Sequence, residues 1–251
     1  MAVVAGVRIE RVLSEDAIGV TAGGTLVTTG ERVGVRHLHE RLAGDDAARL
    51  LFAEEVRRVA RIDHPWLLRV QASDADAEVP WMRTDPLDGE TLEDAVGAGA
   101  WPLARVKTLL QGVLGAFGHL EQRRQVHVAA VPPKFVRAGE GWRLVTLRDV
   151  RAEDEAPRMK GRPFAHARWA PPEMGEERAS SPKARALHAW FAGAIWFALR
   201  TGKSPREAAV PTSKAKTEEG RVLARLLDPE PMRRPHGADA CLALVASVPD
   251  A

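Results

Sequence analysis

The chain has 251 residues, of which 45% are hydrophobic and 28% are charged, and its formal net charge is +2. This composition is typical of an ordinary globular protein, and a charge so close to zero argues against strong attraction to nucleic acid or to a membrane surface. The single cysteine, Cys241, excludes an internal disulfide framework and a cysteine-rich zinc site, and its apolar helical surroundings predict a buried thiol rather than a nucleophile.

Two segments bear on where the protein resides. The amino-terminal sequence MAVVAGVRIERV becomes charged too early for a signal peptide. The longest apolar run, HAWFAGAIWFAL at 188–199, is well short of the roughly 20 residues that span a bilayer. We therefore expect a cytoplasmic protein in which this run forms a buried core helix.

The first part of the chain has the pattern of a β-rich lobe. Short apolar stretches alternate with turn residues over 8–38, which predicts successive antiparallel strands. The period changes at 45–62, which predicts a helix capped by Asp45 or Asp46. The residues that fall at helical spacing are Leu51, Glu55, Val59 and Ile62. Two further strand patterns, HPWLLRVQASD and VPWMRTDPL, complete a predicted lobe of five strands and one helix.

The rest of the chain is mainly helical in pattern. Helices are predicted at 92–97, 102–124, 184–200, 218–227 and 236–247. The segment 134–150 interrupts them, and its pattern predicts a hairpin that turns at RAGEGW. The fold class is therefore α+β, a single domain over 1–251 with an amino-terminal lobe at 8–87 and a carboxy-terminal lobe at 88–248.

Seven short segments carry a family resemblance through their order and spacing. They are LSEDAIGV, VGVRHL, FAEEVRRVARIDHPWLL, PLDGETL, WAPPEM, RTGKSP and LLDPEPMRRP. Together they resemble the motifs of bacterial protein kinases of the eukaryotic-like serine/threonine type, over nearly the whole chain. The resemblance implies a bilobal kinase-like fold, with a small five-stranded β lobe that carries one helix and a larger, mainly helical lobe.

The resemblance also implies which residues stand at the phosphate-binding positions. The three glycines of the family's loop correspond to Ser14, Asp16 and Gly19, a pattern more typical of an ordinary hairpin than of a loop that closes over phosphates. Arg36 stands where the family has a lysine, and Glu55 matches the glutamate with which that lysine pairs. Arginine and lysine are not interchangeable at a tight site, so we expect a structural, partly exposed ion pair between Arg36 and Glu55.

The catalytic positions depart from the family further. His127 and Pro132 keep the register, but Ala129 stands where the family has its base aspartate, and Lys134 where it has a metal-binding asparagine. The metal-binding aspartate corresponds to Asp149. Two alternatives are open for this residue: the Lys134 ammonium pairs with it in place of a metal ion, or it is a strand-end aspartate in solvent.

Other positions concern adenine binding, stability and regulation. The Asp85 carbonyl and the Leu87 N–H correspond to the groups that hold adenine, and Gly34 replaces an alanine whose methyl packs on it. Glu173 and Arg234 match a buried ion pair of the helical lobe. His188 replaces an aspartate of the central helix, which weakens the expected anchoring of the catalytic loop. The segment 150–172 contains no Ser, Thr or Tyr, so nothing in it can be phosphorylated.

These departures predict a pseudokinase, not an enzyme, that acts as a regulatory or scaffolding protein in kinase signalling. The expected partners are proteins such as an active kinase or its substrate, with no nucleic-acid and no membrane partner. No cofactor is expected; Asp85, Leu87 and Asp149 leave room for weak ATP binding, and magnesium is not expected. The alternatives are a nucleotide-binding switch and a weak ATP-dependent transferase that uses other residues.

Overall fold

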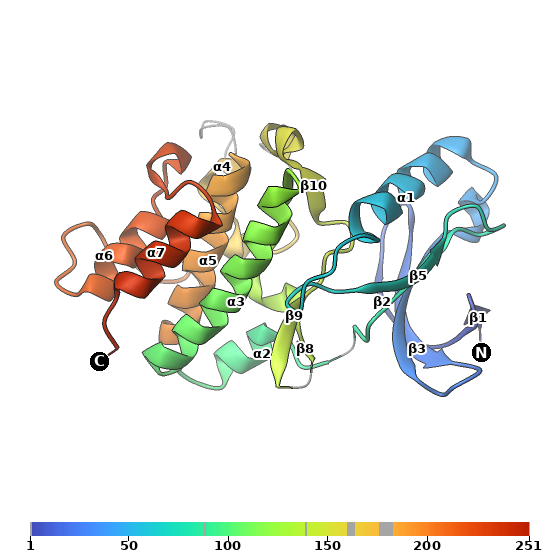
Figure 1. The fold of residues 1–251 in the computed structure, drawn as a ribbon, viewed down its shortest axis with the longest axis horizontal. Coiled ribbons are helices and arrows are strands. Elements are labelled where there is room, and N and C mark those ends of the chain that lie inside the picture. The colour runs from blue at the N-terminus through green and yellow to red at the C-terminus, as the bar shows by residue number, and fades with distance from the viewer. Residues whose placement is uncertain (1, 88, 139, 160–163, 176–182, 251) are drawn as a thin grey trace. The chain divides into compact units, whose positions relative to one another are not determined.

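The computed structural model describes residues 2–87, 89–138, 140–159, 164–175 and 183–250. They form two compact units (Figure 1). The first unit comprises Met1–Glu90 and Val136–Arg148, and the second comprises Thr91–Phe135 and Asp149–Ala251. Residues 160–163, which belong to the segment without phosphorylatable side chains, lie outside the described residues.

The first unit is built on an antiparallel sheet with the strand order β1-β2-β3-β4-β6-β5. Its strands are β1 (Val3–Val4), β2 (Val7–Glu15), β3 (Gly19–Leu26), β4 (Arg32–Leu38), β5 (Val70–Asp74) and β6 (Trp81–Thr84). The prediction of five strands missed β1, which is only two residues long and too short to show an alternating pattern. Buried side chains of β2, β3 and β4 form one apolar cluster, which consists of Val7, Ala22, Val33 and Val35.

The helix of the first unit, α1 (Asp46–Val59), begins where its capping residue predicts. The Asp45 side chain accepts a hydrogen bond from the backbone N–H of Ala48, as an N-cap residue does. Helical spacing does not by itself give the buried face, because Leu51 is 54% exposed. The buried positions of this helix are Ala48, Phe52, Val56 and Val59. Glu55 lies next to this buried stripe and is partly buried.

The second unit consists mainly of helices (Figure 1). They are α2 (Leu92–Gly97), α3 (Leu103–Gln122), α4 (Pro172–Gly175), α5 (Ala184–Thr201), α6 (Glu218–Leu226) and α7 (Ala238–Ser247). Helix α5 is buried from Ala186 to Leu199, and α3 packs against both α5 and α7. A helix that is apolar on all sides is stable only when it is surrounded, so the prediction of a buried core helix is confirmed. None of the described helices is long and apolar enough to cross a membrane.

Short strands complete the chain. Strand β7 (Gln125–His127) pairs antiparallel with β10 (Val150–Ala152), and β8 (Phe135–Ala138) forms a hairpin with β9 (Gly141–Leu144). The predicted hairpin at 134–150 is therefore confirmed. The mixed α+β class is also confirmed, and an antiparallel sheet in one unit with helices in the other is compatible with a kinase-like bilobal fold.

The single cysteine lies in α7. Cys241 is buried, and burial raises the pKa of its thiol to about 12. The thiol is therefore protonated near neutral pH and does not act as a nucleophile. This outcome confirms the prediction of a buried, unreactive cysteine.

Candidate functional site

Arg36 lies on β4 and is only 1% exposed. Its Nε donates a hydrogen bond to Glu55 Oε1 at 2.7 Å, and its Nη1 donates to Thr21 Oγ1 at 3.3 Å. Its Nη2 lies 3.0 Å from Asp16 Oδ2. The structure thus brings Arg36 and Glu55 together, but the expectation of a partly exposed pair is wrong, because three oxygen-bearing side chains enclose the guanidinium.

The two carboxylates that share Arg36 differ in pKa. Burial raises the pKa of Glu55, and the attraction of Arg36 does not offset this effect. Burial also tends to raise the pKa of Asp16. The pKa of this carboxyl is nevertheless lowered, because it is close to Arg36, to two backbone N–H groups and to a second arginine. Asp16 is therefore the more firmly ionised of the two partners.

The positions of the family's glycine loop form the β2–β3 hairpin. Ser14 belongs to β2, Asp16 lies in the turn, and Gly19 begins β3. A Cβ at Gly19 would lie 2.2 Å from the carbonyl oxygen of His37, on the paired strand β4. Glycine is therefore required here for the close approach of two strands.

The positions corresponding to adenine binding are engaged by neighbours within the first unit. The carbonyl oxygen of Asp85 accepts a hydrogen bond from the Thr84 hydroxyl at 2.8 Å, and its carboxylate forms an ion pair with Arg143. Leu87 is buried, and a Cβ at Gly34 would lie 2.6 Å from Leu87 Cδ1. The space that an alanine methyl would take at position 34 is thus filled by the Leu87 side chain.

The second unit brings Lys134 and Asp149 together. Lys134 ends a short 3-10 turn, Pro132–Lys134, and Asp149 directly precedes β10. The Lys134 Nζ lies 2.8 Å from Asp149 Oδ2, with side-chain exposures of 28% and 17%. Of the two alternatives for Asp149, the structure therefore shows the paired one. Ala129, at the position of the base, is buried and carries no group that accepts a proton.

We expect Lys134→Asn to create a response to magnesium that the parent protein lacks. The change removes a positive charge beside Asp149 and supplies an amide oxygen, a ligand type that magnesium accepts. The thermal unfolding midpoint should rise with magnesium chloride in the variant and stay constant in the parent. The matched control is Lys134→Met, which removes the charge without supplying an oxygen and should respond less. An equal magnesium response in the parent protein would contradict the prediction.

His188 corrects one expectation from the sequence. This residue of α5 is fully buried, and its Nε2 accepts a hydrogen bond from the backbone N–H of His127 at 3.1 Å. Its Nδ1 lies 2.8 Å from Glu121 Oε1, so this nitrogen carries the proton and donates to the carboxylate. The expected weakening of the loop's anchoring is therefore wrong, since the imidazole supplies the acceptor that an aspartate would supply.

Glu173 and Arg234 form a bidentate ion pair with no exposure on either side chain. The two guanidinium nitrogens lie 2.5 Å and 2.7 Å from the two carboxylate oxygens. Arg234 Nε also donates to the carbonyl oxygen of Asp228 at 2.7 Å, and the guanidinium lies 4.9 Å from the centre of the Trp190 ring. The pair is thus surrounded by polar and aromatic partners, which is the condition for a buried pair to be stable.

Sequence reasoning missed three residues near these positions. Arg148 lies 2.8 Å from Asp16 Oδ2 through its Nε, and Glu121 accepts from His188. The pKa of His166 is lowered, mainly because the side chain is partly buried and secondly because of the positive charge of Lys134. Only Glu121 carried a local signal, since it is the one acidic residue of α3 and lies in the last turn of that helix.

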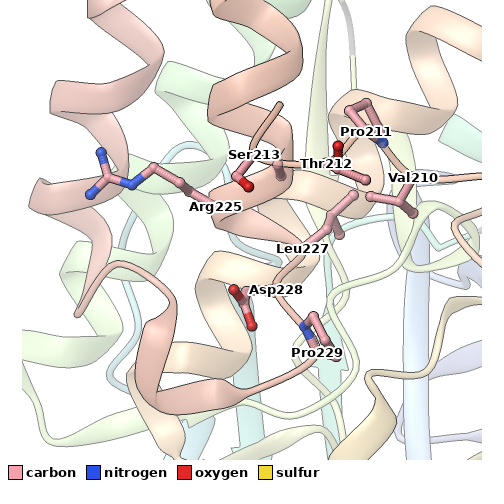
Figure 2. Close-up of a pocket in the computed structure, with 9 residues that line it drawn as sticks. Val210, Pro211, Thr212, Ser213, Arg225, Leu227, Asp228 and Pro229 are labelled. Atoms are coloured by element: carbon pink, nitrogen blue, oxygen red, sulfur yellow. The ribbon is translucent and has the colours of Figure 1, made fainter. Parts of the chain in front are cut away.

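The described residues also line a pocket of about 370 Å³ in the second unit. Figure 2 shows that its wall is formed by 210–213 on one side and by residues around Leu227 and Asp228 on the other. It includes none of the residues at the family's catalytic positions. Among the described residues, no group of three or more His, Cys, Asp or Glu side chains is placed to hold a metal ion.

Comparison with known proteins gives only weak similarities. No family model matches the chain. The chain is similar to bacterial serine/threonine-protein kinases. It is 26% identical over 205 residues to the probable serine/threonine-protein kinase PkwA of Thermomonospora curvata, covering 80% of this chain and 26% of the relative. It is 27% identical over 209 residues to PknJ of Mycobacterium tuberculosis, covering 81% of this chain and 35% of the relative.

A third relative, the kinase AfsK of Streptomyces coelicolor, is 27% identical over 118 residues, which are 47% of this chain and 15% of the relative. The chain thus spans between about a seventh and a third of the length of these kinases. The weak homology supports a kinase-like family. It also corrects one prediction: the expectation that the chain is not an enzyme is wrong, because the similar proteins are named as serine/threonine-protein kinases, which are enzymes.

Proposed function

We propose that this chain is a degenerate kinase-like protein that acts in kinase signalling as a regulatory or scaffolding binding protein. Its partner is a protein such as an active kinase or a kinase substrate. The observation that carries the proposal is that key polar groups are paired within the chain: Asp149 with Lys134, and Arg36 with Asp16 and Glu55. The side chains at positions that the family uses for phosphate chemistry are thus bound to one another. We infer that the retained fold serves the recognition of another protein.

Binding is proposed beside catalysis and not in place of it, because the similar proteins are enzymes. The proposal is supported by the scaffold, whose buried ion pair between Glu173 and Arg234 is well formed. A protein that recognises a partner needs a stable surface, and a buried pair contributes to stability only with complete geometry. No cofactor is part of the proposed binding role.

The test compares the activity of a kinase encoded in the same genome in the presence and in the absence of this chain. The purified chain is titrated into the kinase and its substrate, while complex formation and the rate of phosphate incorporation are followed. We expect a saturable change in that rate, which reaches its plateau as the complex reaches a fixed stoichiometry. A protein of similar size and charge serves as the control. Absence of both a complex and a rate change across the genome's serine/threonine kinases would overturn the proposal.

A second candidate is phosphate transfer from ATP by a route that does not use the position of Ala129. The similarity to named kinases favours it. The group tested is the carboxylate of Asp149, at the position of the family's metal-binding aspartate. Incubation with labelled ATP and a protein lysate should then give label that Asp149→Asn removes. Absence of label, or label unchanged in that variant, would contradict this candidate. Thermal stabilisation by ATP without any transfer would instead favour a nucleotide-binding switch.

A further inference from the structure

The first unit holds a pocket of about 300 Å³ that contains none of the residues at the family's catalytic positions. Arg36 reaches α1 through Glu55, and the next residue of β4, His37, points to the opposite face because side chains alternate along a strand. The pocket therefore lies on the face of the sheet that α1 does not cover. The residues that define this β1 pocket are Val3, Val4, His37, Glu40, Glu78 and Trp81.

One wall of the β1 pocket is the short strand β1. Two residues with positive φ, Ala5 at 52° and Gly6 at 72°, fold β1 back onto β2, as a tight two-residue hairpin turn does. This turn brings Val3 and Val4 to the pocket. Val3 is 59% exposed, so its side chain contributes little to the core of the unit and is accessible to a ligand.

The opposite wall is the segment between β5 and β6, and an arginine of α1 holds it in place. The guanidinium of Arg49 donates hydrogen bonds to the carbonyl oxygens of four consecutive residues, 75–78, at 2.9 to 3.5 Å. It also donates to the carbonyl oxygen of Ala43 at 3.1 Å. The backbone that carries Glu78 is thus fixed before a ligand arrives, which lowers the entropy lost on binding.

The polar side chains of the β1 pocket mainly accept hydrogen bonds. Glu40 and Glu78 are exposed, neither forms an ion pair with another described residue, and no described lysine or arginine lines the pocket. His37 Nδ1 lies 2.9 Å from the carbonyl oxygen of Leu38. A carbonyl oxygen can only accept, so Nδ1 carries the proton and Nε2 of the neutral imidazole is an acceptor. Two negative charges and a further acceptor favour a cationic ligand.

The aromatic residue of the pocket indicates which kind of cation fits. Trp81 of β6 is the direct cross-strand neighbour of His37, so the two side chains lie next to each other on the same face. The face of an indole ring attracts cations, and a planar guanidinium stacks on it. A metal ion fits less well, because the described residues include no group of three His, Cys, Asp or Glu side chains placed to hold one.

We propose that the β1 pocket binds a guanidinium group, which stacks on Trp81 and donates hydrogen bonds to Glu40 and Glu78. The five N–H donors of a guanidinium point in several directions within one plane, so they can serve acceptors that come from separate segments. The group belongs either to a free guanidinium compound or to an arginine side chain. This inference goes beyond the partner binding proposed above and does not depend on it.

The test measures the binding of agmatine and of N-acetyl-arginine amide to the full chain by isothermal titration calorimetry. Both carry a guanidinium group and no carboxylate; the first is a free small molecule, and the second represents an arginine within a protein. We expect saturable binding at millimolar concentration, and the tighter ligand identifies the source of the group. Glu40→Gln and Glu78→Gln should each weaken binding roughly fivefold to tenfold, because each removes a charge-assisted hydrogen bond.

The matched control for the variants is Glu31→Gln, which removes the same charge at an exposed position of the first unit outside the pocket. It should bind as the parent protein does. The matched control for the ligand is N-acetyl-citrulline amide, a neutral analogue of similar shape that should not bind. A second measurement uses nuclear magnetic resonance: the indole N–H signal that is missing in Trp81→Leu should shift during titration of the parent protein.

Absence of saturable binding by both guanidinium ligands would overturn the proposal, as would equal binding of the citrulline analogue. Affinity that is unchanged in both Glu40→Gln and Glu78→Gln, or that falls equally in Glu31→Gln, would show that binding occurs elsewhere. If Trp81→Leu folds poorly, Trp81→Phe identifies the same indole signal while keeping a ring in the pocket. An indole signal of Trp81 that does not move while the ligand binds would also contradict the site.

Discussion

Replacement of Arg234 by alanine is expected to lower the free energy of unfolding by about 3–5 kcal/mol. The reason is that Glu173, whose side chain has no exposure, would remain as a buried carboxylate without its bidentate partner. The contact of the guanidinium with Trp190 and its hydrogen bond to the Asp228 carbonyl would be lost as well. Denaturant unfolding, followed by circular dichroism, measures the change.

The double variant sharpens this prediction. Glu173→Ala should destabilise by a similar amount, and Arg234→Ala combined with Glu173→Ala should lose much less than the sum of the two. The control is Arg221→Ala, whose exposed pair with Glu218 should contribute about 0–1 kcal/mol. Equal and small effects at Arg234 and Arg221 would show that the buried pair does not stabilise the second unit.

His188→Ala should lower the free energy of unfolding by about 2–4 kcal/mol. The change leaves the backbone N–H of His127 without its acceptor and Glu121 without the imidazole N–H. It also removes a ring that stacks on Phe117 with centroids 4.2 Å apart. Unfolding in denaturant measures the loss, and hydrogen exchange at the His127 amide should rise more than exchange elsewhere in the second unit.

Two conservative variants separate the hydrogen bonds of His188. In His188→Asn, the side-chain amide reaches about as far as the imidazole Nδ1 and should keep the hydrogen bond to Glu121. In His188→Gln, the amide reaches further, and its oxygen should keep the hydrogen bond from the His127 backbone N–H. Each should restore part of the lost stability. His236→Ala, at an exposed histidine, should change stability by about 0.5 kcal/mol or less. Exchange at the His127 amide that is unchanged in His188→Ala would contradict the anchoring role.

The sequence by itself predicted the local elements of this protein well. Helix α5 followed from an unbroken apolar run, α1 from its period and its capping aspartate, and the β8–β9 hairpin from a glycine-rich turn between two strand patterns. These features are readable because hydrogen bonding within a helix or a turn depends on residues close in sequence. The resemblance to kinases rested on the same kind of information, namely short motifs in a fixed order.

Only the tertiary structure decided which distant side chains meet. Leu51 is exposed and Leu87 fills the space above Gly34, although both are apolar residues in regular patterns. Glu121 and His188 are 67 positions apart in sequence, and Asp16 meets Arg36 and Arg148 through different elements. Such contacts depend on strand register, on helix rotation within a fraction of a turn, and on the path of connecting segments. A local pattern specifies none of these. The resemblance to kinases predicted the pair of Arg36 with Glu55 and offered that of Lys134 with Asp149, whereas the contacts of Asp16 became visible only in the folded chain.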